Sequence, residues 1–180
     1  MIKKRRDESL SNIKEKARKY SIKEGIFSSA KDSLGVQYIS PFAIAINSSN
    51  SLVALLSSLP SLLGPISQMV GSRQIAKKSR KGIVLRNVFR ESFVWIFFIL
   101  ICILFSKNIL VFYLPFFVLL GFCLYEIFAG LAHPAWFSWI GDLVDEGYRG
   151  AWFSKRNLIT GFVAVILALV ASFFLDYFKK

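Results

Sequence analysis

Three ionisable residues lie inside long apolar runs, where a charge is costly and usually functional. Lys31 and Asp32 fall within the first apolar segment, and Glu126 falls within Ile109–Leu131. Burial in a membrane disfavours the ionised form of each group, whereas a nearby opposite charge favours it. Opposed effects of this kind let a carboxyl change protonation with a modest change in its surroundings. We therefore take these three residues as candidates for ion or solute coupling, with Lys31 as the first candidate partner of Glu126.

A polar stripe accompanies the acid of the first apolar segment. Its members recur at helical spacing: Ser28, Asp32, Gly35 and Tyr38. One face of a helix there would be polar and would suit a cavity, so Tyr38 joins the coupling candidates. The alternative is purely structural, with Lys31 paired to Asp32 or to Glu126 between helices.

A second concentration of charge, Gly130–Asn157, joins two apolar runs. It holds three acids and three bases: Asp142, Asp145, Glu146, Arg149, Lys155 and Arg156. Glycines on either side of Arg149 allow the backbone to reverse in a short space. We expect a compact turn at one membrane face, in which Asp142, Asp145 and Arg149 belong to a charge network.

An enzyme is the weaker alternative for this stretch. Intramembrane aspartyl proteases use G-x-G-D, but Trp139 stands where the first glycine belongs, and Asp142 falls at the interface. The chain contains no G-x-S-x-G, H-E-x-x-H or P-loop spacing. Its two cysteines lie in separate apolar runs without metal-ligand spacing. We expect no enzyme, no metal site and no cofactor.

The composition favours a membrane protein over a soluble one. The chain has 180 residues, of which 54% are hydrophobic, and a mean hydropathy of +0.51. Its net charge of +12 comes from 23 bases and 11 acids. The bases fall in gaps between apolar runs rather than on a soluble face, so a nucleic-acid partner is not expected and the lipid bilayer is. The expected fold is an all-α polytopic membrane bundle.

Five transmembrane helices are predicted, after a basic lead over residues 1–21 and within a membrane domain over 22–180. The spans are placed near 24–46, 52–71, 83–105, 109–138 and 156–176. The uncharged part of the first is too short to cross a bilayer, so its helix is expected to begin near Gly25. The lead either lies on anionic lipid head groups or only sets the orientation, and we favour the second.

Two further predictions concern the second and third spans. One face of the second carries small or polar residues that would let a neighbouring helix approach closely: Ser57, Ser61, Gly64 and Gln68. Arg90 and Glu91 lie near the charged end of the third span. We interpret both as interface charges that extend toward the head groups, with Arg90 in the charge network.

The distribution of bases predicts the orientation. Nine precede the first span, seven lie between the second apolar run and the third (Arg73 to Arg90), and three lie between the fourth and fifth, whereas the opposite side has three in total. Cytoplasmic loops carry the excess of Lys and Arg, so the N-terminus and the Gly130–Asn157 turn are expected in the cytoplasm of a plasma-membrane protein.

Two motifs resemble the N-terminal half of a major facilitator superfamily transporter. The first is the basic loop between the second and third spans, where the family has G-x-x-x-D-[RK]-x-G-[RK]-[RK]. Lys77, Arg80 and Lys81 match its basic positions, whereas Ser72, Ala76 and Ser79 stand at its Gly, Asp and Gly. The second is the D-x-x-x-x-x-x-R-G turn, matched by Asp142, Arg149 and Gly150.

The resemblance implies secondary active transport of a small solute by two six-span halves. Since five spans are predicted, we expect either a fragment or a half-size subunit that needs a second half. On this basis Lys77, Arg80 and Lys81 would contribute to cytoplasmic gating. The alternative function is a non-transporting accessory or scaffold subunit, which would tolerate neutral substitution of Asp32, Glu126 and Asp142.

Overall fold

The chain is an all-helical membrane protein. The computed structural model describes residues 2–178, with the side chains of residues 12–178, and contains no strand in that range. Four helical segments are long and apolar enough to cross a membrane: Asn50–Ile75, Arg80–Ser106, Val111–Gly141 and Glu146–Phe178. These confirm the all-α membrane class and coincide with the second to fifth predicted spans.

The first predicted span has a different local structure from the other four. One helix, α1 (Ile2–Leu34), carries both the basic lead and the beginning of the span, so the helix starts well before Gly25. It ends at Leu34, and the N–H of the following Gly35 donates to the carbonyl oxygen of Lys31 at 2.9 Å. A 3-10 turn, η1 (Val36–Tyr38), and the short helix α2 (Ile39–Ala45) follow. A fifth span composed of these pieces remains a prediction.

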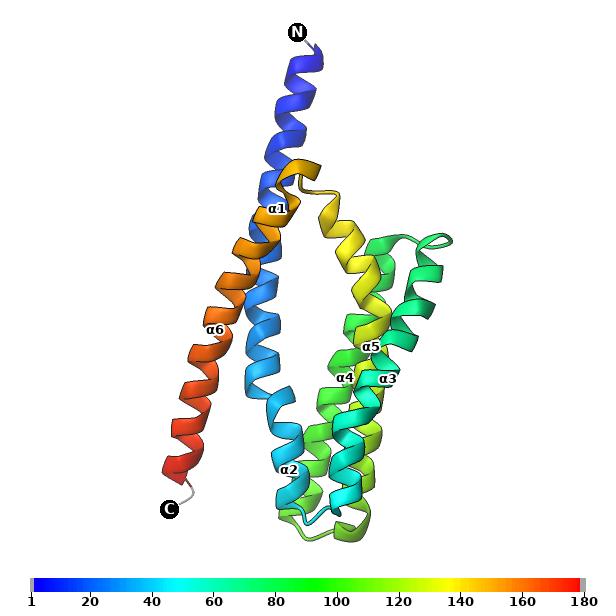
Figure 1. The fold of residues 1–180 in the computed structure, drawn as a ribbon, viewed down its shortest axis with the longest axis vertical. Helices are drawn as coiled ribbons and strands as arrows, with labels where there is room; N and C mark the ends of the chain where they lie inside the picture. The colour runs from blue at the N-terminus through cyan, green and yellow to red at the C-terminus, as the bar shows by residue number, and fades with distance from the viewer. Residues whose placement is uncertain (1, 179–180) are drawn as a thin grey trace. The chain divides into compact units, whose positions relative to one another are not determined.

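The chain divides into two compact units. The terminal unit contains both chain ends, 1–38 and 140–180, and the central unit is Ile39–Trp139. In the terminal unit, α1 packs along α6 (Arg149–Phe178), and the 3-10 turn η3 (Glu146–Tyr148) precedes α6 (Figure 1).

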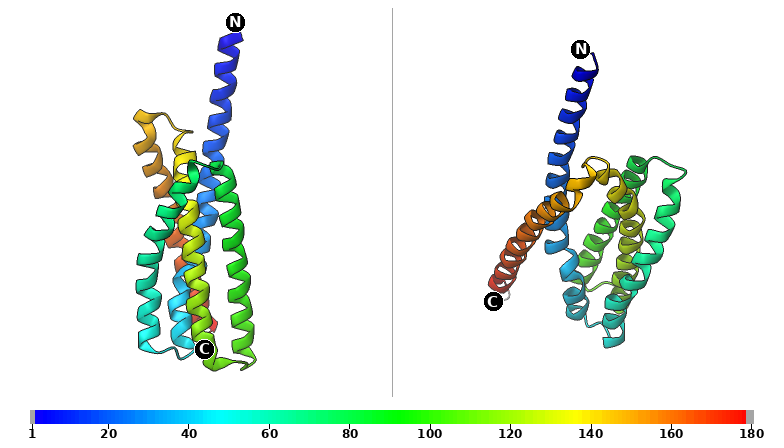
Figure 2. Two further views of the ribbon diagram at one scale, coloured as in Figure 1. Left: turned by 90° about the vertical axis from the view of Figure 1, so that its right-hand side faces the viewer. Right: turned by 45° about the horizontal axis from the view of Figure 1, so that its top comes forward.

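The central unit is formed by α2, α3 (Asn50–Ile75), α4 (Arg80–Ser106), η2 (Val111–Tyr113) and most of α5 (Leu114–Gly141). Its three long helices run alongside one another (Figure 2). Serine caps start two of them, because the hydroxyl of Ser49 accepts from Leu52 N–H at 3.3 Å and that of Ser79 accepts from Gly82 N–H at 3.2 Å. The basic loop described from the sequence lies at the second of these starts.

Helices α3 and α5 approach closely at glycines. A Cβ on Gly71 would lie 2.6 Å from the carbonyl oxygen of Leu131, and one on Gly130 would lie 2.7 Å from Cβ of Ser67. The buried residues of α3 are Leu56, Gly64, Ser67 and Gly71. The predicted small-residue face is therefore right at Gly64 and wrong at Ser57, Ser61 and Gln68, which are exposed. The interface lies on a different face of the helix.

Candidate functional site

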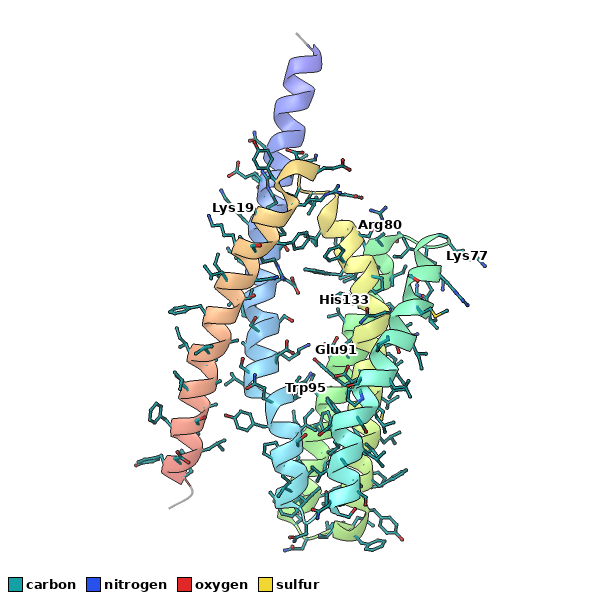
Figure 3. All side chains as sticks on the ribbon, in the orientation of Figure 1. Lys19, Lys77, Arg80, Glu91, Trp95 and His133 are labelled. Atoms are coloured by element: carbon teal, nitrogen blue, oxygen red, sulfur yellow. The ribbon has the colours of Figure 1, made fainter. Side chains whose placement is uncertain are left out.

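The candidate site is a row of buried polar side chains on α4, in the central unit. Asn87 and Glu91 lie one helical turn apart and are only 3% and 7% exposed. Trp95 follows one turn further along (Figure 3). With a rise of about 1.5 Å per residue, Glu91 lies roughly 16 Å from the start of α4, near the middle of a membrane-length helix. We call Asn87, Glu91 and Trp95 the α4 polar row.

Two atoms of the α4 polar row have no hydrogen-bond partner among the described residues: Oδ1 of Asn87 and Nε1 of Trp95. The Asn87 amide is oriented by its nitrogen, since Nδ2 donates to the carbonyl oxygen of Ile83 at 3.0 Å. This leaves Oδ1 as an acceptor and the indole N–H as a donor, both buried. An unsatisfied buried polar group costs roughly 1–3 kcal/mol, so a water or a bound solute is the usual reason for keeping one.

Aromatic rings adjoin the indole end of the row. The ring of Trp95 lies 5.9 Å from that of Tyr125 in an edge-on arrangement and 5.7 Å from that of Phe98. Tyr125 in turn stacks on Phe122, with centroids 6.1 Å apart. The row thus combines a carboxylate, an amide acceptor and an N–H donor beside an aromatic wall.

The chemistry available to the row includes binding and proton transfer. A carboxylate, an amide and an indole can orient a polar solute or hold a cation, and a carboxyl group can also accept or donate a proton. Across the part of the chain that the structure describes, no three His, Cys, Asp or Glu side chains are grouped so that they could hold a metal ion.

Burial of Glu91 corrects the interpretation of this residue as an interface charge. The neighbouring Arg90 is exposed, and its guanidinium carbon lies 5.9 Å from the ring centroid of Phe128, a cation–π contact within the central unit. The signal that could have identified Glu91 is its spacing from Asn87, Val94 and Phe98, which places it on the core-facing side of α4.

The predicted coupling residues belong to two different units. Lys31 and Asp32 form an ion pair on α1, with Nζ 3.5 Å from Oδ1, and their side chains are 31% and 51% exposed. Tyr38 ends η1 in the same unit and is partly exposed. Glu126, partly buried on α5, lies in the central unit. A local Lys31–Asp32 pair is thus present, and pairing of Lys31 with Glu126 remains a prediction.

Arg149 organises the charged turn of the terminal unit. Its Nε donates to the carbonyl oxygens of Gly141 at 2.9 Å and Val144 at 3.1 Å, and its Nη1 lies 3.6 Å from Oε1 of Glu146. Carbonyls at the end of a helix lack partners within it, so a cation there satisfies them and opposes the negative end of the dipole. Asp145 pairs with Lys14 of α1 at 3.7 Å. Asp142 is exposed at this turn.

The basic loop places its three predicted residues differently. Arg80 starts α4, and its Nη1 donates to the carbonyl oxygen of Ser138 on α5 at 3.4 Å. Lys77 extends from the α3–α4 turn away from the helices (Figure 3), and Lys81 is exposed. Of these three residues, only Arg80 therefore connects two helices of the central unit.

Arg156 was counted in the sequence only as one base of a loop, yet among the described side chains of the terminal unit it is the most deeply buried charge. It is 9% exposed, and its Nη2 lies 3.0 Å from Oε2 of Glu24 while its Nε donates to the Ser21 carbonyl oxygen at 3.3 Å. Gly25 leaves room for this guanidinium, since a Cβ there would lie 2.6 Å from Nη2. The sequence signal for this pair was that Glu24 and Arg156 each lie at the edge of an apolar run, where opposite charges can meet.

Comparisons with known proteins leave this arrangement to be interpreted on its own geometry. No protein-family model matches the chain, and no match was found among curated proteins or among solved structures.

Proposed function

We propose that this chain is the membrane subunit of a secondary transporter for a small solute, and that the α4 polar row lines the solute pathway. The observation that carries the proposal is Glu91, 7% exposed near the middle of an apolar helix long enough to span a bilayer. Asn87 stands beside it with an open acceptor atom.

The cost of burying these groups supports a functional role. A charged side chain at the centre of a membrane helix costs about 3 kcal/mol on insertion scales, and such residues usually face a bundle interior or a water-filled pathway. An apolar row would pack at least as well, since replacing buried polar groups by apolar ones of similar volume is often neutral or stabilising. Fixed donors and acceptors in an apolar surround are what a small-molecule site requires.

The membrane arrangement we propose follows the charge distribution. The basic lead, the α3–α4 turn and the Arg149 turn lie on the cytoplasmic side of the plasma membrane, and α1 with α2 forms the first of five spans. The chain works with a second half, in the manner of major facilitator transporters, where the solute site lies near the bilayer midplane between two halves. Lys31, Asp32 and Glu126 are the proposed residues for ion or solute coupling.

An accessory or scaffold role is the second candidate, and one observation favours it. The apolar surface of α6 is extensively uncovered by its own chain, with Leu158 75%, Phe162 68% and Phe173 74% exposed. A surface of this kind suits lipid or a partner helix. An accessory subunit would use α6 for assembly and would have no need of Glu91.

Solute uptake by cells that naturally carry the chain tests the proposal, because any second half is then present. A deletion strain is complemented with the wild type, Glu91→Gln or Ser92→Ala, and each strain is given labelled amino acids, sugars, organic acids and amines. We expect one solute class to accumulate only on complementation, and uptake to fall at least tenfold in Glu91→Gln at equal membrane abundance.

Ser92 supplies the matched control, since it adjoins Glu91 but is exposed, and its hydroxyl donates to the Val88 carbonyl oxygen on the same helix. Ser92→Ala should transport as the wild type does. Equal uptake by Glu91→Gln and the wild type would exclude the polar row as the pathway. If no solute distinguishes the deletion strain, and a second membrane chain is lost from its complex, the accessory role is favoured.

A further inference from the structure

The end of the central unit at the α3–α4 turn presents an unusually uniform basic surface. Five exposed bases lie within 14 positions along the chain: Arg73, Lys77, Lys78, Lys81 and Arg86. No acid occurs between Ser72 and Arg90. None of the five bases has an ion pair within residues 12–178. We call this group the basic collar.

Exposed apolar side chains continue directly from the basic collar along α4. Leu85 is 56% exposed and lies four residues after Lys81, and Phe89 is 65% exposed and lies three residues after Arg86. Residues three and four apart share a helix face, so each base stands one turn from an exposed apolar side chain. Val88, 46% exposed, lies three residues after Leu85 on the same side of the helix.

Exposed apolar side chains also adjoin the basic collar on α3, where they precede the bases in the chain. Met69 and Val70 are 60% and 47% exposed, and Arg73 follows on the same side one turn later. Lys77 then projects from the turn beyond the end of the helix (Figure 3). Both helices thus pass from apolar to basic toward the same turn. Arg80 takes no part, because it donates to the Ser138 carbonyl oxygen.

We propose that the basic collar binds the head group of an anionic phospholipid, whose acyl chains lie along Leu85, Val88 and Phe89. Charge complementarity selects this occupant, since five bases without a neighbouring acid match a phosphate-bearing anion. The adjoining exposed apolar face matches the acyl chains and distinguishes a lipid from a free anion. Each base near an anionic lipid surface contributes an attraction of about 1 kcal/mol, or roughly a fivefold preference. The proposal is independent of the transport function.

The protein carries its own reporter at this end of the unit. Trp136 and Trp139 of α5 pack against a core formed by Ile83, Val84 and Ala135. Ile83 and Val84 lie between Lys81 and Arg86 in the chain. Lipids brominated on their acyl chains quench tryptophan fluorescence on contact, so a lipid held at the collar should quench more than one that is free to exchange.

The test reconstitutes the full chain in vesicles of phosphatidylcholine that contain either brominated phosphatidylglycerol or brominated phosphatidylcholine at equal mole fraction. We expect stronger quenching by phosphatidylglycerol in the wild type. In the variant Lys77→Gln, Lys78→Gln, Lys81→Gln the preference should fall by at least tenfold, as removal of three attractions of the size given above requires. Replacement of the same three lysines by arginine should retain it.

A matched control removes three exposed bases from α1 in the terminal unit, by Lys16→Gln, Lys19→Gln and Lys23→Gln, and should leave the preference unchanged. Equal loss in both triple variants would show a general effect of net charge and overturn the proposal. Retention in the collar variant would overturn it as well. Loss of the preference on addition of millimolar inorganic phosphate would identify a free-anion site rather than a lipid site.

Discussion

The two units bring helices together at glycines in physically different ways. In the central unit Gly71 faces main-chain atoms of α5. A Cβ on Gly71 would lie 2.6 Å from the carbonyl oxygen of Leu131 and 3.1 Å from the Cα of Leu131. In the terminal unit Gly25 faces two side chains of α6, because a Cβ there would lie 2.6 Å from Nη2 of Arg156 and 2.8 Å from Cγ2 of Thr160. A main chain in a helix cannot move aside locally, whereas a side chain can shift to some extent. The first contact should therefore be more rigid than the second.

The two units also differ in how their buried polar groups are satisfied. The Arg156 guanidinium is hydrogen bonded to Glu24 and to the Ser21 carbonyl, so this buried charge holds α1 to α6. The α4 polar row retains an acceptor and a donor atom with no partner among the described residues. A satisfied buried charge stabilises a helix pair, whereas open buried atoms are available to a ligand. We therefore expect Arg156 to act in helix assembly and the α4 polar row to act in ligand binding.

Gly71→Ala should produce the largest effect. Its Cβ would collide with the Leu131 main chain, and overpacking of this kind costs typically about 1–3 kcal/mol. Gly64→Ala is the matched control on the same helix, because a Cβ there meets nothing within 4 Å although the residue is buried. We expect the midpoint of detergent-induced unfolding, followed by circular dichroism, to fall clearly for Gly71→Ala and to remain or rise for Gly64→Ala. Equal midpoints would show that α3 and α5 are not packed tightly.

Arg156→Met should have the next largest effect. It removes two hydrogen bonds, but Glu24 is half exposed (52%) and can be rehydrated, so we expect a loss of about 1–2 kcal/mol rather than the larger cost of a stranded buried charge. Lys155→Met, at the exposed neighbouring position, is the control. Proteolysis of the α1 segment should accelerate in Arg156→Met alone. An identical rate in both variants would mean that Arg156 does not hold α1 to α6.

Gly25→Ala sharpens the comparison between the two glycine contacts. The nearest atom is again at 2.6 Å, but this atom of Arg156, and Cγ2 of Thr160 at 2.8 Å, belong to side chains and not to a main chain. Alanine also favours a helix over glycine by nearly 1 kcal/mol, which offsets part of the cost of moving these side chains. We expect a smaller loss of unfolding free energy than for Gly71→Ala. A loss as large as that of Gly71→Ala would show that the guanidinium is fixed.

The smallest effect concerns Glu15, exposed on α1. A hydrogen bond and the charge of Lys19, at 2.7 Å, hold the pKa of this carboxyl below its usual value. A lowered pKa in the folded state means that the pair stabilises the helix above the unfolded pKa, near 4.3, and that this support is lost as the pH falls through the lower folded value. Helicity of α1 should therefore decrease slightly on acidification below about pH 4, and Glu15→Gln should remove that step.

The sequence alone determined the class and the positions of the four membrane-length apolar helices. Apolar runs of bilayer length, with bases confined to the gaps, required an all-helical membrane protein, because a chain in lipid must satisfy its backbone internally. The charged turn held by Arg149 followed from local chemistry, since glycines and charges are concentrated between two apolar runs. These signals depend on residues close together in the chain, so they can be read without knowledge of packing.

Only the tertiary structure decided which side of each helix is buried. In α3 the predicted face included Gln68, but the buried face includes Ser67 and Gly71. In α4 an acid expected at the interface is buried, and in α6 a base of the loop joins α1 to α6. A membrane helix is apolar around most of its circumference, so periodicity hardly marks the face that meets a neighbour. That choice depends on the rotation of each helix against partners distant in the sequence, which is why Glu91 and Arg156 emerged only from the packed structure.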